Sequence, residues 1–181
     1  MAGPRNTARG GAVLSDCGRY RYSLERGISS ALPNALFIGV NPSTADGLQD
    51  DPTIRKMMGF CRAHGWGRME VVNLFAYRCT DIRHLAWASE PVGPENDETI
   101  FQAMQFAQVV IPCWGARGKL PGHLHYRIQE IHHQLGLLGP RTEVKCLGYT
   151  QSGDPRHPLM LAYSTPLVPY KPAPHQLHLE T

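Results

Sequence analysis

Four short apolar runs of the chain each end in residues that can take part in chemistry. These ends are Asn41-Pro42-Ser43, Asn73, Trp114-Gly115 and Arg156-His157-Pro158. The runs have the length of buried strands. In an open parallel sheet, ligands bind beyond the carboxyl ends of the strands, so these ends are expected to line one crevice. The pattern predicts an enzyme built around a single site.

Two asparagines in these ends are candidates for handling a substrate. Asn41 follows the run 36–40, where its amide either positions a water or stabilises the loop as an Asx-turn. Asn73 is the first polar residue after Val71 and Val72, and its amide offers a donor and an acceptor at fixed geometry. Such a pair suits the Watson–Crick edge of a base, while the alternative is an asparagine that caps a loop.

A histidine and a carboxylate complete the candidate catalytic set. His157 can donate a hydrogen bond to an oxygen that becomes negative in a transition state, or it is simply a turn histidine. Asp46, in the loop after the first buried strand, is the preferred carboxylate for stabilising a sugar cation or orienting water. Asp51 precedes Pro52, so its alternative role is to cap the next helix.

The loop from Gly115 to Lys119 is a weak candidate for phosphate binding. Its backbone N–H groups and the cations Arg117 and Lys119 could cradle a phosphate. The chain lacks the glycine patterns that bind dinucleotides and nucleoside triphosphates. The histidines lack ligand spacing, and Pro112-Cys113 lacks the second cysteine of a zinc deaminase. We therefore expect neither a cofactor nor a metal.

Composition indicates one compact domain. The chain has 181 residues, of which 42% are hydrophobic and 18% charged, with a net charge of +3. Arginines 5, 9, 19, 21 and 26 make the first segment basic, which fits either a solvated face or phosphate contacts. The five cysteines form no C-x-x-C pair, and neither a secretory signal nor a membrane span is evident. We expect a soluble, cytoplasmic monomer.

The order of the expected elements predicts an α/β fold. Strands are expected near 20–24, 36–40, 69–74, 109–113 and 144–149, and helices from Pro52 to Gly65, from Pro94 and near 124–135. This alternation predicts a three-layer α/β/α domain over 19–165, around a central, mainly parallel four-stranded sheet. Residues 1–18 are expected to be a flexible basic arm, and 166–181 an extended proline-rich tail.

These residues resemble the uracil-DNA glycosylase superfamily. The shared motifs, in the same order over about residues 35–160, are Gly39-Val40-Asn41-Pro42, Val71-Val72-Asn73, the apolar strand that ends in Trp114-Gly115, and His157-Pro158. More narrowly, the chain is similar to a bacterial and phage family that is still described as a domain of unknown function. That similarity rests on Asn41 to Asp46 with Asp50 to Thr53, Asn73 to Ala76, Pro91 to Asp97 and Arg156 to Leu159.

The resemblance implies a DNA glycosylase that acts on a flipped-out base. Asn73 would read the base, His157 would support the departing base as an anion, and Asn41 with Asp46 would place the water that attacks the sugar C1′. Further contacts to the base or substrate would come from Pro42, Ser43, Phe75, Trp114 and Arg156. DNA, either single-stranded or a modified duplex, would be the partner.

Two departures from the superfamily pattern suggest a bulky, modified or damaged pyrimidine rather than plain uracil. No aromatic residue lies between Asn41 and Phe60, and Leu159 stands where a serine usually follows the His-Pro motif. Two other functions stay open. The scaffold would either transfer a group to a base in phage or bacterial DNA, or bind nucleic acid without catalysis.

Overall fold

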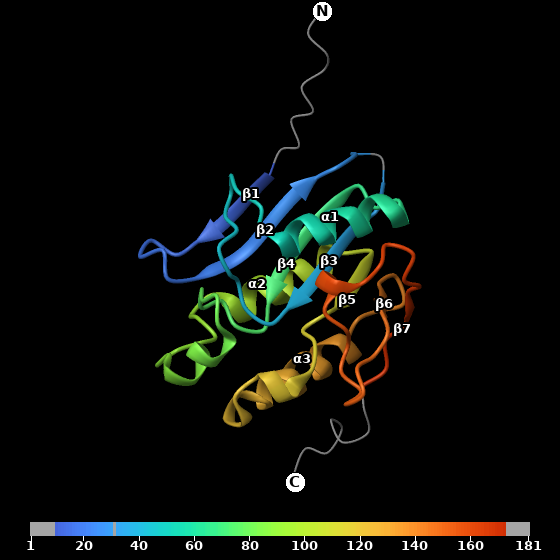
Figure 1. Cartoon of the computed structure of the whole chain (residues 1–181). Coiled ribbons are helices and arrows are strands. Elements are labelled where there is room, and N and C mark those ends of the chain that lie inside the picture. Colours follow the sequence, from blue (N-terminus) through green and yellow to red (C-terminus); the bar gives the residue numbers. More distant parts are fainter. Residues whose placement is uncertain (1–9, 31, 173–181) are drawn as a thin grey trace, which may run out of the picture.

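The computed structural model describes residues 10–30 and 32–172 as a mixed seven-stranded sheet with helices on both faces (Figure 1). The strands lie in the order β1-β2-β4-β3-β5-β6-β7. In chain order the elements are β1 (Gly10–Leu14), β2 (Arg21–Gly27), β3 (Asn34–Gly39), α1 (Pro52–His64), β4 (Arg68–Asn73), α2 (Asn96–Phe106), β5 (Val109–Pro112), α3 (Tyr126–Gly136), β6 (Glu143–Cys146) and β7 (Val168–Pro169). Short 3-10 helices occupy Ile82–Trp87, Arg117–Lys119, Gly122–Leu124 and Pro158–Met160.

The centre of the sheet is parallel. Strands β4, β3, β5 and β6 run in the same direction, and Phe37 of β3 aligns with Val71 of β4 and Ile111 of β5. Strands β1 and β2 add antiparallel pairs at one edge, and β7 adds one at the other. The prediction of a mainly parallel central sheet is therefore confirmed, but the whole sheet has seven strands rather than four.

Successive side chains of β3 point to opposite faces of the sheet and so contribute to two separate core layers. Phe37 faces a cluster that includes Met57 and Phe60 of α1. Leu36 and Ile38 face the opposite cluster, which includes residues of α2 and α3. Helix α1 therefore covers one face of the sheet, and α2 and α3 cover the other. Each fully buried large apolar side chain in these layers contributes about 1.5–3 kcal/mol.

The ends of the described chain are more ordered than the sequence predicted. Gly10 pairs with Arg26 in the antiparallel contact between β1 and β2, where an irregular arm was expected. Pro169 pairs with Lys145, and β7 lies where a tail was expected. Edge strands that are largely exposed need no apolar alternation, so the sequence carries no signal for them. The rest of the predicted arm and tail, residues 1–9 and 173–181, lies outside the described residues.

Helix α1 begins and ends as its sequence predicts. Asp51 is its N-cap, because the Asp51 carboxylate accepts a hydrogen bond from the backbone N–H of Ile54. Pro52 occupies the first turn, and Gly65 ends the helix with a φ of 71°. This cap places the start of α1 beside the carboxyl end of β3. Within the described ranges, no helix is long and apolar enough to cross a membrane.

Candidate active site

A cleft of about 860 Å³ lies at the carboxyl ends of the central parallel strands. Its size is typical of sites for small molecules. The structure brings together in this cleft eight of the predicted residues, from segments far apart in the sequence. They are Asn41, Ser43, Asn73, Trp114, Gly115, Lys119, Arg156 and His157.

Asn73, the last residue of β4, is buried with its amide held in one orientation. Its Oδ1 accepts a hydrogen bond from Nη2 of Arg21 at 3.3 Å, so Nδ2 remains as a donor. A Cβ on Gly39 would lie 2.7 Å from Nδ2 of Asn73, so only glycine leaves room for the amide. The backbone carbonyl of Asn73 accepts a further hydrogen bond from Asn96 at 3.0 Å. Side chain and backbone are therefore both fixed.

Arg21, the first residue of β2, is a buried cation that lines the cleft. It is only 2% exposed, and Nη1 donates to the carbonyl of Ala45 at 2.9 Å. Burial lowers the pKa of Arg21 to about 10, which still leaves it charged at neutral pH. Among the described residues no carboxylate forms an ion pair with it, and Nε has no hydrogen-bond partner. A buried cation without an ion-pair partner is energetically costly and typical of functional sites.

The Asn41 amide is anchored by a neighbouring loop. Nδ2 donates to the carbonyls of Cys79 at 2.7 Å and Pro42 at 3.1 Å. Because these contacts occupy the amide N–H groups, Oδ1 is the atom that can accept a hydrogen bond from a ligand or water. The thiol of Cys79 also lines the cleft, but burial and then Asp81 raise its pKa, which disfavours the thiolate.

His157 presents one nitrogen to the cleft. Its Nδ1 accepts a hydrogen bond from the backbone N–H of Leu159 at 3.3 Å, so the neutral ring carries its proton on Nε2. Burial, followed by the charge of Lys119, lowers the pKa of His157, whereas Asp51 opposes this shift. Gly115 packs against it, since a Cβ there would lie 3.3 Å from the His157 Cβ. The ring is therefore a positioned neutral donor.

Asp46 does not lie in the cleft. Its Oδ1 accepts hydrogen bonds from the backbone N–H groups of Leu48 and Gln49, both at 2.8 Å, and thus closes a turn. These two bonds also lower its pKa. The structure instead places Asp51 in the cleft, where its charge acts on both His157 and Arg21. Capping α1 and lining the cleft are compatible, because the cap uses only Oδ1.

Three of the predicted substrate contacts lie partly or wholly behind the cleft. Phe75 is fully buried in the core beneath α2 and α3 and does not line the cleft. Pro42 does not line it either, and its carbonyl accepts a hydrogen bond from the backbone N–H of Cys79 at 3.0 Å. Trp114 lines the cleft but is only 4% exposed, with its ring edge-to-face against His132 and Tyr170. With its ring packed against these two side chains, Trp114 is poorly placed to act as a stacking platform for a base.

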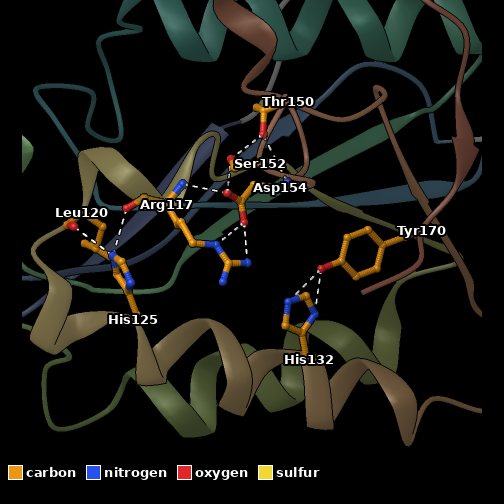
Figure 2. Close-up of polar contacts among 8 residues, drawn as sticks. All are labelled: Arg117, Leu120, His125, His132, Thr150, Ser152, Asp154 and Tyr170. Atoms are coloured by element: carbon orange, nitrogen blue, oxygen red, sulfur yellow. Dashed lines mark hydrogen bonds and ion pairs between the residues drawn. The ribbon is translucent and has the colours of Figure 1, made fainter. Parts of the chain in front are cut away.

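The predicted phosphate loop is largely committed to internal contacts. Asp154, fully buried, accepts hydrogen bonds from Nε and Nη2 of Arg117 through Oδ1, and from the Arg117 backbone N–H through Oδ2 (Figure 2). The N–H of Gly115 donates to the carbonyl of Pro155 at 2.9 Å. Arg117 is therefore a structural residue, and of the loop's two cations only Lys119 lines the cleft.

The histidines near α3 also have structural contacts. His125 lies within 3.0 Å of the carbonyls of both Arg117 and Leu120, and His132 lies 2.7 Å from the Tyr170 hydroxyl (Figure 2). In the described part of the chain, no group of three or more His, Cys, Asp or Glu side chains is arranged to hold a metal ion.

Sequence reasoning missed Arg21 as a residue of the site. The alternation of Tyr20, Arg21 and Tyr22 predicted a strand, and the basic bias of this segment was compatible with a solvated face. In the structure Tyr20 and Tyr22 stack on each other, and Arg21 reaches the cleft. A buried arginine is indistinguishable from an exposed one in sequence, because its burial depends on contacts with residues distant in the chain, such as Ala45 and Asn73.

Comparison with known proteins gives one relationship. A family model described as "Protein of unknown function (DUF1643)" matches residues 21–159. No curated protein and no solved structure matches the chain. The matched segment runs from β2 through the His157 loop and contains nearly all of the cleft. The chain therefore belongs to the DUF1643 family.

Proposed function

We propose that this protein is a DNA N-glycosylase with a fold like that of the uracil-DNA glycosylases. It would act, as a monomer and without a cofactor, on a modified or damaged pyrimidine flipped out of the DNA. One observation carries the proposal: the fixed amide of Asn73 and the Nε2 donor of His157 line the same cleft. A pyrimidine offers carbonyl oxygens that both donors can engage.

Base recognition rests on Asn73. Because Arg21 fixes Oδ1, the donor Nδ2 is the group that meets a base carbonyl. The cleft volume of about 860 Å³ leaves space for a substituent on the ring. Flipping the nucleotide costs a few kcal/mol of unstacking, which contacts in the cleft must supply.

Bond cleavage rests on His157, Asn41 and Asp51. As the bond between C1′ and the base nitrogen breaks, its electron pair moves onto the base, and Nε2–H of His157 hydrogen-bonds the base oxygen that becomes negative. The Asp51 carboxylate stabilises the positive charge on the sugar. Oδ1 of Asn41 accepts a hydrogen bond from the water that attacks C1′, and the proton released from this water passes to solvent.

The test is a product analysis on DNA that carries normal, deaminated, oxidised and hypermodified pyrimidines. Mass spectrometry should detect a free base, and alkali should cleave the DNA at the resulting abasic site. His157→Ala should lower kcat by about 10²–10³, the usual effect of losing one oxyanion donor. Asn41→Ala should also lose turnover. The exposed His133 provides the control, since His133→Ala should keep wild-type activity.

Two results would contradict this proposal. A mass change retained on the nucleoside would indicate group transfer, although the raised pKa of the Cys79 thiol disfavours covalent catalysis by the cysteine in the cleft. Wild-type rates in both the Asn41→Ala and His157→Ala variants would show that neither residue has the catalytic role assigned to it.

A further inference from the structure

A second cavity adjoins the candidate active site. It has a volume of about 460 Å³ and is here called the arginine recess. Its lining residues are Gly18, Arg19, Ser43, Thr44, Arg78, Cys79 and Thr80. Ser43, Cys79 and Thr80 also line the cleft, so the two cavities are contiguous at these residues. A ligand longer than the cleft can therefore extend into the recess.

The fold brings the two arginines of the recess together from distant parts of the chain. Tyr20, just before β2, forms an antiparallel bridge with Tyr77, which follows β4. Beyond this bridge the backbone N–H of Arg78 donates to the carbonyl of Arg19 at 3.0 Å. The backbones of the two arginines are therefore held together, and both residues line the recess.

Neither arginine has a carboxylate partner among the described residues. Arg19 is exposed, and Nη1 of Arg78 donates only to the carbonyl of Gly18, at 3.2 Å. In the ranges that the structure describes, no carboxylate forms an ion pair with either residue, and the enclosed Nε of Arg78 has no partner. The charge of Arg78 contributes to the lowered pKa of Asp46, after the hydrogen bonds from Leu48 and Gln49, but the two side chains form no ion pair within the described ranges.

Two other buried or half-buried arginines of the fold have carboxylate partners. Arg26 pairs with Asp50 at 2.7 Å, and Arg117 pairs with Asp154 at 2.8 Å. Enclosing Nε of Arg78 without a hydrogen-bond partner is costly, and two cations without a carboxylate partner beside a cavity favour an anionic ligand. Hydroxyl groups of Ser43, Thr44 and Thr80 add donors of the kind that hold phosphate oxygens.

We propose that the arginine recess binds a phosphodiester group of the nucleotide next to the one in the cleft. This inference rests on the proposed function only in assuming that the cleft holds a nucleotide. If the recess holds a neighbouring phosphodiester, the substrate is a polynucleotide chain rather than a free nucleotide. Arg19 and Arg78 each contact phosphate oxygens, which positions the strand without reading its sequence.

The experiment measures binding of a fluorescein-labelled single-stranded oligodeoxynucleotide by anisotropy at several salt concentrations. The double variant Arg19→Gln/Arg78→Gln should reduce the magnitude of the slope of log K against log salt by about 0.7, the contribution of one neutralised phosphate of a single strand. Extrapolated from 1 M to 0.1 M salt, this corresponds to about 5-fold weaker binding. Arg78→Lys should keep most of the slope.

Arg62 gives a matched control. It is exposed, lies in the last turn of α1 and has no ion pair among the described residues. Arg62→Gln removes the same charge and should leave both affinity and slope as in the wild type. Thermal unfolding of all variants checks that the fold is retained.

The outcomes separate this inference from the proposed function. A reduced slope in the double variant supports the recess even when no base is released, because binding requires no turnover. Absence of oligonucleotide binding by the wild type at low salt overturns the inference, as does an equal slope for Arg62→Gln and the double variant. Weakening of thymidine monophosphate binding to the same degree as the oligonucleotide also overturns it, since the recess would then hold the nucleotide's own phosphate.

Discussion

Substituting Gly39 by alanine tests whether the position of the Asn73 amide controls the site. The new Cβ would lie 2.7 Å from Nδ2 of Asn73, whereas ordinary contacts begin at about 3.4 Å. The amide must therefore move by about 0.7 Å, the difference between these distances. Asn73 is buried and held by Arg21, so it cannot swing freely into solvent.

Two magnitudes follow for Gly39→Ala. Forcing a methyl group into a packed site costs about 1–3 kcal/mol of unfolding free energy. A displacement of about 1 Å at a recognition group lowers catalytic efficiency by about 10²-fold. Urea denaturation measures the first, and kcat/KM for base release measures the second. Gly11→Ala is the control, because Gly11 is also a strand residue but a Cβ added there would have nothing within 4 Å of it.

A double-mutant cycle isolates the contact. In an Asn73→Ala background the clash is absent, so Gly39→Ala should cost at least 1 kcal/mol less than in the wild type. An equal cost in the two backgrounds would refute the reasoning, because the loss would then come from the strand backbone and not from the amide. Wild-type kcat/KM in Gly39→Ala would refute the role of Asn73 in recognition.

Two further predictions concern His157 and Asp154. Burial and the charge of Lys119 hold the pKa of His157 below its usual 6.5, so the folded protein favours the neutral ring. The folding stability linked to His157 is therefore complete above pH 6.5. It falls as the pH drops from 6.5 toward the pKa of His157 in the folded protein. The acid limb of a pH profile of kcat/KM should therefore have its midpoint below 6.5, and its persistence in His157→Gln would contradict this assignment. Asp154→Asn leaves Arg117 without its buried carboxylate and should cost about 3–5 kcal/mol in urea denaturation, whereas Asp81→Asn, in an exposed pair with Arg83, should leave stability nearly unchanged. Equal stability of the two variants would show that the Asp154 pair is not a structural anchor.

The position of the cleft could be predicted from the chain because it follows from strand order. A polar residue directly after a buried strand has few places to go in an α/β fold, and Asn41, Asn73 and His157 accordingly meet at the same end of the sheet. The choice between Asp46 and Asp51 could not be predicted. Both lie in one loop, and local hydrogen bonds to Leu48 and Gln49 direct Asp46 away from the cleft.

The sequence by itself determined the parallel core, the two helical layers and the start of α1 at Asp51-Pro52, because these depend on local periodicity and capping. Tertiary structure decided the rest. Arg21 is buried through contacts with Asn73 and the carbonyl of Ala45, and the Tyr20–Tyr77 bridge brings Arg19 to Arg78. Likewise, the fold commits Arg117 to Asp154 and thereby removes it from the predicted phosphate site. The physical reason is common to all three: the state of a charged side chain depends on partners distant in sequence, which no local pattern encodes.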